Sequence, residues 1–215
     1  TIAARVEPPR GTRGVMVMEL VEETTQVEFK RRRFTVAELL HLSKIGFLGI
    51  DERVELIRGE IVEMSPIGED HASSVMRLNV LLSSVFGRRL YVNVQNPLRL
   101  DDETLTQPDV TLLRPRDDFY SRQHPGPEDI LLLIEVSDTT LAYDRRVKAD
   151  LYSAAGVLEC WIINLPKRVI EVYREPRPDG YRTVTRYAPG ETLSPLAFAD
   201  VVLNVEDVLG RIEHG

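Results

Sequence analysis

The run Ile-Leu-Leu-Leu-Ile-Glu-Val at residues 130–136 decides the fold class. Its consecutive apolar residues have the length of one strand, and a strand without polar alternation is buried on both faces. A sheet that is buried on both faces requires helices packed against it. The acidic residue of the run, Glu135, is costly to bury unless it is paired, hydrogen-bonded or bound to a cation. The run therefore predicts a covered central strand and a first candidate site residue.

Patterns on both sides of this strand predict the rest of the core. A long helix follows the candidate N-cap Asp70. Its apolar face consists of Val75, Leu78, Leu82 and Val85. A second helix runs from Thr139 or Thr140 to Ala155. Its apolar face consists of Val147, Leu151 and Ala154. Further extended segments span residues 91–100, 105–114 and 160–165. The order helix, three strands, helix, strand predicts an α/β or α+β sandwich, with helices packed on a mixed central sheet.

Additional elements flank this core at both ends. Thr35 and Glu38 form a capping-box pattern at the start of a short helix. Its apolar stripe consists of Leu39, Leu42 and Ile45. One hairpin is predicted between residues 54–57 and 60–64, around Arg58-Gly59, and another between residues 169–173 and 181–187. We therefore expect a partly flexible N-terminal extension over residues 1–33, one domain over residues 34–209 and a tail over residues 210–215.

The composition is that of an ordinary soluble globular protein. The chain has 215 residues, of which 43% are hydrophobic and 28% charged. No apolar run reaches the roughly 18 residues of a membrane span. A single cysteine, Cys160, excludes a disulfide framework within the chain and any cysteine-cluster metal site. We therefore expect a cytoplasmic protein that does not enter membranes.

The charge is unevenly distributed along the chain. Residues 34–215 hold 20 basic against 29 acidic residues, a net charge of −9. This balance speaks against non-specific binding to nucleic acid, which depends on neutralising phosphates, but it suits a site built from carboxylates. Other chemistries lack their motifs, since the sequence holds no glycine-rich phosphate loop and no nucleophile elbow, and one cysteine with scattered histidines disfavours zinc.

Two acids and a lysine form the candidate catalytic set. Asp109 opens a strand directly after Pro108, and Glu135 follows 26 residues later, a spacing that lets neighbouring strands bring both acids to one edge. Such oxygens suit Mg²⁺, whose remaining positions are filled by water and substrate phosphate. Lys148 borders the buried face of the second helix and could act on a metal-bound water or neutralise a phosphodiester under attack. Alternatively, Lys148 forms a surface ion pair with Asp144, worth about 0.3–0.5 kcal/mol.

Four further residues have two interpretations each. Glu55 is either a further metal or water contact or a solvated strand acid. His71, at a helix start, either orients phosphate or water near the site or lies at the core edge with a satisfied ring. Gln95 either lines the cleft or is an edge-strand amide. Tyr152 either holds Lys148 by a hydrogen bond or only buries its ring.

These residues belong to an ordered series of short motifs. The motifs are Val54-Glu-Leu-Ile-Arg-Gly-Glu, His71, Gln107-Pro-Asp-Val, Ile134-Glu-Val-Ser, Tyr143-Asp-Arg-Arg-Val-Lys, Tyr152, Ala155-Gly-Val and Glu159-Cys-Trp-Ile-Ile. Together they resemble the PD-(D/E)xK nuclease superfamily and, more closely, the Uma family of restriction endonucleases. The resemblance extends over about residues 34–209.

The resemblance implies a restriction-endonuclease-like αβββαβ core, with a hairpin added at each end, and divalent-metal hydrolysis of DNA. Asp109, Glu135 and the backbone carbonyl of Val136 would hold Mg²⁺ or Mn²⁺, and Lys148 would position or polarise the attacking water. The superfamily's usual lysine stands two residues after the glutamate, where this chain has Ser137. In the Uma family the lysine lies on the following helix, as Lys148 does. The alternative function is a catalytically silent nuclease-fold module that acts through interactions.

We also expect a homodimer. Nucleases that cut both strands of DNA commonly dimerise, and the exposed backbone of an edge strand can pair across a two-fold axis. The segment 169–173, or the terminal hairpin to which it belongs, is the edge that we expect to pair.

Overall fold

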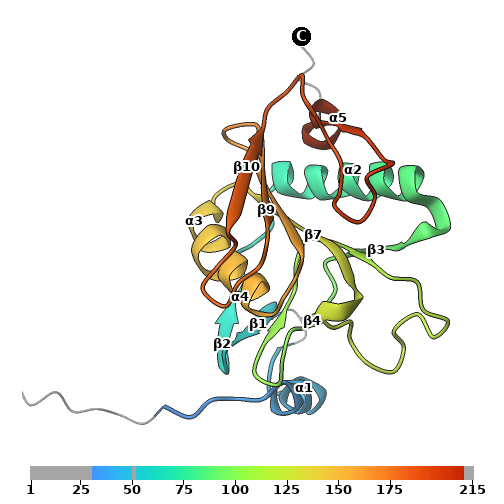
Figure 1. The fold of residues 1–215 in the computed structure, drawn as a ribbon. Helices are drawn as coiled ribbons and strands as arrows, with labels where there is room; N and C mark the ends of the chain where they lie inside the picture. The colour runs from blue at the N-terminus through green and yellow to red at the C-terminus, as the bar shows by residue number, and fades with distance from the viewer. Residues whose placement is uncertain (1–30, 50–51, 211–215) are drawn as a thin grey trace, which may run out of the picture. The chain divides into compact units, whose positions relative to one another are not determined.

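We describe a computed structural model of the chain, over residues 31–49 and 52–210 (Figure 1). The predicted N-terminal extension falls almost wholly outside these residues, as does most of the predicted tail. Their boundaries therefore stay a prediction. The elements that form the described part of the chain begin at a short helix, α1 (Val36–Lys44), and end at another, α5 (Val205–Leu209).

A six-stranded mixed sheet lies at the centre of the fold, with strand order β10-β9-β8-β7-β6-β3. The strands are β3 (Tyr91–Val94), β6 (Val110–Leu113), β7 (Ile130–Ser137), β8 (Glu159–Asn164), β9 (Val169–Arg174) and β10 (Thr183–Tyr187). The pair β7 and β8 is parallel, and the other pairs are antiparallel. The predicted central strand is confirmed as β7, whose residues are buried except for a partly exposed Leu131.

Helices cover both faces of this sheet, as the alternation of side chains along β7 requires. On one face, α2 (Glu69–Phe86) and α5 pack over Leu132, Ile134 and Val136. On the other face lies a continuous helical segment. It consists of α3 (Leu141–Tyr143), the π-helical turn η3 (Asp144–Lys148) and α4 (Ala149–Ala154). Glu135 lies between Ile134 and Val136 in β7, so its side chain points to the opposite face of the sheet, toward the helical segment of α3, η3 and α4. The mixed sheet flanked by helices confirms the predicted fold class.

A smaller four-stranded sheet has the order β2-β1-β5-β4. Its strands are β1 (Val54–Ile57), β2 (Glu60–Glu63), β4 (Leu98–Arg99) and β5 (Leu105–Thr106). The predicted hairpin around Arg58-Gly59 is confirmed, and both turn residues have positive φ angles, 50° and 80°, as a two-residue hairpin turn requires. Leu56 and Leu105 of this sheet form a core with Val36 and Leu39 of α1.

The predicted segments 91–100 and 105–114 are each divided between the two sheets, so the expectation of single long strands was wrong. The first breaks after β3, where Gln95 has a φ of 49° and Pro97 follows. The second breaks at Pro108, two residues before β6 begins at Val110. Proline has no N–H to donate to a strand ladder, which explains both interruptions. They place Gln95 and Asp109 where the two sheets meet.

Several predicted helix faces differ in detail. The first long helix starts at Glu69 with Gly68 as its N-cap, and Val85 is 39% exposed while Phe86 is buried. Ile45 is 60% exposed because α1 ends before it. In the second helix Ala154 is exposed, and the side chains that pack against the sheet are those of Ala149, Leu151 and Tyr152.

The remaining elements complete the surface. These are the short turns η1 (Gly87–Arg89) and η2 (Pro127–Asp129), and the strand pair β11 (Thr192–Leu193) and β12 (Leu203–Asn204).

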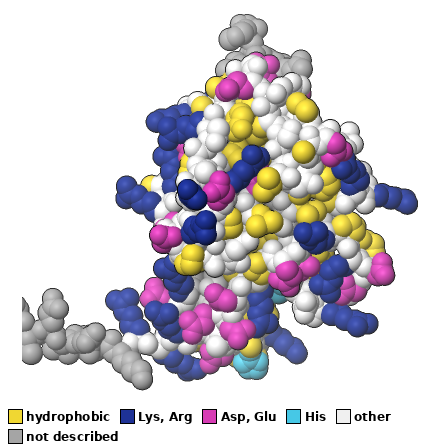
Figure 2. All heavy atoms as spheres, viewed as in Figure 1, with side chains coloured by type: hydrophobic (Ala, Val, Ile, Leu, Met, Phe, Trp, Pro, Cys, Tyr) yellow, Lys and Arg dark blue, Asp and Glu magenta, His cyan; other side chains and the backbone are white. Residues whose placement is uncertain are grey.

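The prediction that residues 169–173 form an edge was wrong, since β9 lies between β8 and β10. The edges of the large sheet are β10 and β3. On the face seen in Figure 2, Lys and Arg side chains are interspersed with Asp and Glu. Within residues 31–49 and 52–210, no helix has the length and apolar character to cross a membrane.

Candidate active site

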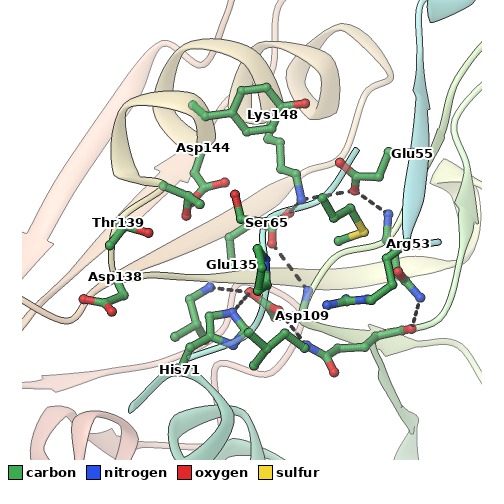
Figure 3. A pocket seen from close by; sticks show the side chains of 18 of the residues that line it. Arg53, Glu55, Ser65, His71, Asp109, Glu135, Asp138, Thr139, Asp144 and Lys148 are labelled. Atoms are coloured by element: carbon green, nitrogen blue, oxygen red, sulfur yellow. Dashed lines mark hydrogen bonds and ion pairs between the residues drawn. The ribbon is translucent and has the colours of Figure 1, made fainter. Parts of the chain in front are cut away.

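A pocket of about 450 Å³ lies where β1, the start of α2, the junction of the two sheets and η3 meet (Figure 3). Seven of the eight residues predicted for the site line it. They are Glu55, His71, Gln95, Asp109, Glu135, Val136 and Lys148. The eighth, Tyr152, is fully buried behind the pocket and contacts Glu135. The fold therefore brings together residues from five separate elements and from the loops that join them.

Asp109 is held by partners on three sides. Its Oδ1 atom accepts a hydrogen bond from Gln95 Nε2 at 3.2 Å. Its Oδ2 atom accepts one from the backbone N–H of Val136 at 2.9 Å and lies 3.0 Å from His71 Nε2. Burial raises the pKa of Asp109, but these partners outweigh burial and hold that pKa below its ordinary value. Asp109 is therefore ionised and locked in one orientation at neutral pH.

Glu135 is 2% exposed and lies next to Asp109. The backbone N–H of Asp109 donates to Glu135 Oε2 at 3.4 Å, and the Tyr152 hydroxyl donates to Oε1 at 2.5 Å. Burial raises the pKa of Glu135, and the charge of Asp109 adds to this effect while Lys148 opposes it. The two acids thus share one edge of the sheet, as their spacing predicted.

Lys148 bridges two carboxylates. Its ammonium lies 3.1 Å from Glu55 Oε1 and 3.2 Å from Glu135 Oε1, and its side chain is 8% exposed. Burial alone would lower the pKa of Lys148, but Glu135, Glu55 and Asp144 together raise it above its ordinary value. Glu55 also accepts a hydrogen bond from the backbone N–H of Gln107 at 2.7 Å. It is 2% exposed, so the interpretation of Glu55 as a solvated strand acid was wrong.

Asp144 is buried and hydrogen-bonded to two hydroxyl groups, so it does not form a surface ion pair. It is 4% exposed and accepts hydrogen bonds from Ser137 Oγ and Thr140 Oγ1, both at 2.7 Å. Burial raises its pKa in spite of these two bonds. Because Lys148 and Asp144 are both buried, the surface-pair alternative was wrong. The serine that replaces the superfamily's usual lysine serves instead to hold this carboxylate.

The supporting residues have partners that sequence spacing did not show. Tyr152 hydrogen-bonds to Glu135, so neither of its two interpretations, a hydrogen bond to Lys148 or burial of the ring alone, was right. Gln95 and His71 both contact Asp109, so neither is a plain edge amide or a core histidine. His71 Nδ1 is buried and has no hydrogen-bond partner within the described part of the chain. The hydrogen bond to Asp109 raises the pKa of His71.

Gln107 and Arg53 are among the pocket residues that carried no prediction of their own. Gln107, which precedes the Pro-Asp motif, donates its side-chain amide to the backbone carbonyl of Gln95 at 2.6 Å as well as its backbone N–H to Glu55. Arg53, next to β1, lines the pocket. Gln107 belongs to the motif Gln107-Pro-Asp-Val, and this motif could have indicated its place in the site. Nothing in the sequence distinguished Arg53 from other arginines.

The pocket has the donor chemistry of a divalent-metal site. Four buried carboxylates line it, and with two exposed acids they outnumber the basic side chains of Arg53, His71 and Lys148. The buried carboxylates are Glu55, Asp109, Glu135 and Asp144. Among the described residues, no group of three or more His, Cys, Asp and Glu side chains is placed to hold a metal ion. Mg²⁺ does not require one, because it binds through one or two carboxylates and keeps several waters. Asp109 and Glu135, which lie next to each other in the pocket, supply carboxylate oxygens of the kind that such an ion takes.

Comparison with known proteins supports this fold and shows the family of the chain. The crystal structure of a putative nuclease belonging to DUF820, from Anabaena variabilis ATCC 29413, superposes with a TM-score of 0.61 at 17% sequence identity. The match covers 82% of this chain and 97% of that one, and it supports the fold. No curated protein matches the chain. A family model described as "Putative restriction endonuclease" matches residues 36–206. The chain therefore belongs to the Uma2 family, as its motifs indicated.

Proposed function

We propose that this protein is a metal-dependent nuclease that hydrolyses phosphodiester bonds in DNA. The observation that best supports this proposal is the convergence of Asp109, Glu135 and Lys148 in one pocket with excess negative charge. Membership of a family described as restriction endonucleases supports a nuclease role, and the metal and the DNA substrate are our proposal.

Each residue then has a definable task. Asp109, Glu135 and the Val136 carbonyl would hold Mg²⁺ or Mn²⁺, which lowers the pKa of bound water and stabilises charge on a phosphate. Lys148 would orient the attacking water and neutralise charge that develops on the phosphate. Glu55 and Tyr152 would hold Lys148 and Glu135 in place.

Partners and location follow as further proposals. We propose a homodimer, in which the edge strand β10 pairs with its counterpart across a two-fold axis. A monomeric mass in light scattering at working concentration would exclude this assembly. A cytoplasmic location is consistent with the single buried, unpaired cysteine Cys160.

A catalytically silent interaction module is the second candidate. It is favoured by the way Lys148 already neutralises Glu55 and Glu135, which leaves these acids satisfied within the protein. The acidic balance of residues 34–215 also disfavours general affinity for nucleic acid. The two candidates differ in whether the protein cuts DNA when a divalent metal is present.

Cleavage of a supercoiled plasmid in Mg²⁺ or Mn²⁺ separates them, with EDTA as the metal-free control and RNA of matched length as a second substrate. We expect Lys148→Met to slow single-turnover cleavage about 10²–10⁴-fold. Lys167→Met, which removes an exposed lysine outside the pocket, is the matched control and should cut at the wild-type rate. No cleavage by the wild type in either metal would favour the silent module. Equal rates in all variants would remove Lys148 from the mechanism.

A further inference from the structure

One cation in the pocket has no partner among the pocket's acids. Three side chains that can carry positive charge line the pocket, namely Arg53, His71 and Lys148. Lys148 is bound by Glu55 and Glu135, and His71 is bound by Asp109. Within residues 31–49 and 52–210, no ion pair or side-chain hydrogen bond joins Arg53 to another group. Its guanidinium is therefore available to an anion from outside.

The backbone places Arg53 firmly at this position. Arg53 directly precedes β1, and its carbonyl accepts a hydrogen bond from the backbone N–H of Met64 at 2.9 Å, which extends the β1–β2 hairpin by one pair. Its side chain is partly exposed and points into the pocket (Figure 3). It lies close enough to His71 for their charges to interact. A fixed backbone thus presents a cation in the pocket that has no ion-pair partner among the described residues.

The charge of the pocket favours such a cation for binding an anionic substrate. Besides the four buried acids, the exposed acids Glu63 and Asp138 line the pocket. Acidic side chains therefore outnumber the basic ones there, and Arg53 would offset the repulsion of a phosphodiester together with Lys148 and the proposed metal. Arginine suits this task, because its planar guanidinium donates two parallel hydrogen bonds to phosphate oxygens and is weakly hydrated.

We infer that Arg53 binds non-bridging oxygens of a phosphate of the nucleic-acid substrate and so draws the strand into the pocket. This inference rests on the proposed nuclease function and adds a substrate-binding residue to it. Arg53 would contact a backbone phosphate and no base, so its contribution should be the same for every DNA sequence. It should also depend on salt, because each phosphate that a protein neutralises releases counterions.

The test is binding of a fluorescent DNA duplex, measured by anisotropy over a series of salt concentrations in Mg²⁺. The proteins carry Lys148→Met so that the duplex stays intact, which a gel verifies. The variants are Arg53→Gln and Arg53→Lys. The control is Arg88→Gln, which removes an exposed arginine of η1, beyond the end of α2 that is remote from the pocket. Melting temperatures of all variants are measured in parallel, so that loss of folding is recognised.

We expect Arg53→Gln to weaken binding about 10- to 100-fold, as loss of a charge-assisted phosphate contact does. The slope of log Kd against log salt should fall by about 0.9, the value for one phosphate of duplex DNA. Arg53→Lys should be intermediate, because lysine keeps the charge and loses the two-pronged hydrogen bond.

Equal effects of Arg53→Gln and Arg88→Gln, or an unchanged slope, would overturn the inference while leaving the nuclease proposal intact. A lower melting temperature of Arg53→Gln with an unchanged slope would show a structural role instead. Failure of the wild type both to bind and to cut nucleic acid would refute the proposed function itself, and the inference with it.

Discussion

Replacement of Lys148 by methionine tests the buried charge bridge that organises the pocket. Methionine has a similar length and no charge, so the substitution keeps most of the packing and removes the ammonium. Glu55 and Glu135 then face each other without the cation that lies 3.1 and 3.2 Å from them. The free energy of unfolding should fall because two carboxylates stay buried with less compensation.

The size of this effect follows from the burial of the bridge. The Lys148 and Glu55 side chains are 8% and 3% exposed, so solvent screens their interaction little. Removing one partner of a buried ion pair costs about 3–5 kcal/mol. The hydrogen bond from Gln107 to Glu55 remains, and Glu135 can take up a proton, so we expect the lower end of this range. For a chain of this size about 3 kcal/mol corresponds to a decrease in Tm of roughly 6–12 °C.

Urea unfolding followed by circular dichroism measures the change in the free energy of unfolding. The slope m should be the same for the wild type and the variants, which shows that they expose the same surface on unfolding. Lys167→Met is the matched control, and its effect should stay within about 0.5 kcal/mol, as for most exposed positions. The double variant Glu55→Gln/Lys148→Met should be more stable than Lys148→Met alone, because no unpaired charge is left on Glu55. A loss below about 1 kcal/mol, or strictly additive effects in this cycle, would refute the bridge as the structure shows it.

Three further outcomes are expected. Millimolar Mg²⁺ or Mn²⁺ should raise the Tm of the wild type, because a ligand that binds only the folded state stabilises it by mass action. Asp109→Asn should remove this increase in Tm. An increase that persists in the variant would show that the metal binds elsewhere. Tyr152→Phe deletes a hydrogen bond to the Glu135 carboxylate and should cost about 1.5–3 kcal/mol in chemical unfolding, so a neutral effect would contradict that bond. Burial raises the pKa of Glu171, but its contacts with Arg145 and its other partners outweigh burial and lower that pKa. The stability that Glu171 contributes is therefore complete above its unfolded pKa, near 4.5, and is lost as pH falls toward its folded pKa. Glu171→Gln should flatten the acid side of a stability–pH curve, and an unchanged curve would argue against the pair.

The core elements were predictable because local patterns and the tertiary environment agree there. The uninterrupted apolar run predicted β7, and the period of Val75, Leu78 and Leu82 predicted the buried face of α2. The capping box of Thr35 and Glu38 is present at the start of α1. These features depend on neighbours within one turn or one strand, which the sequence displays directly.

The predictions failed where distant contacts or a backbone irregularity decide the outcome. The apolar pattern of residues 91–100 and 105–114 is that of long strands, yet Pro97 and Pro108 divide them between two sheets. The apolar stripe of the second helix predicted a buried Ala154, yet Ala154 is exposed while Lys148 and Tyr152 are buried. Tyr152 is buried against Glu135 of the distant strand β7, a contact that the periodicity of the helix does not contain.

For the candidate site, the sequence by itself predicted seven residues that line the pocket and the meeting of Asp109 and Glu135 at one edge. The tertiary structure alone decided the partners. Lys148 joins Glu55, 93 positions earlier in the chain, and Tyr152 binds Glu135 instead of Lys148. Acidic residues can be recognised from their unusual place in an apolar pattern, because burying a charge demands a partner. Which partner satisfies that demand depends on how the small sheet packs against the large one, and this packing has no local signature in the sequence.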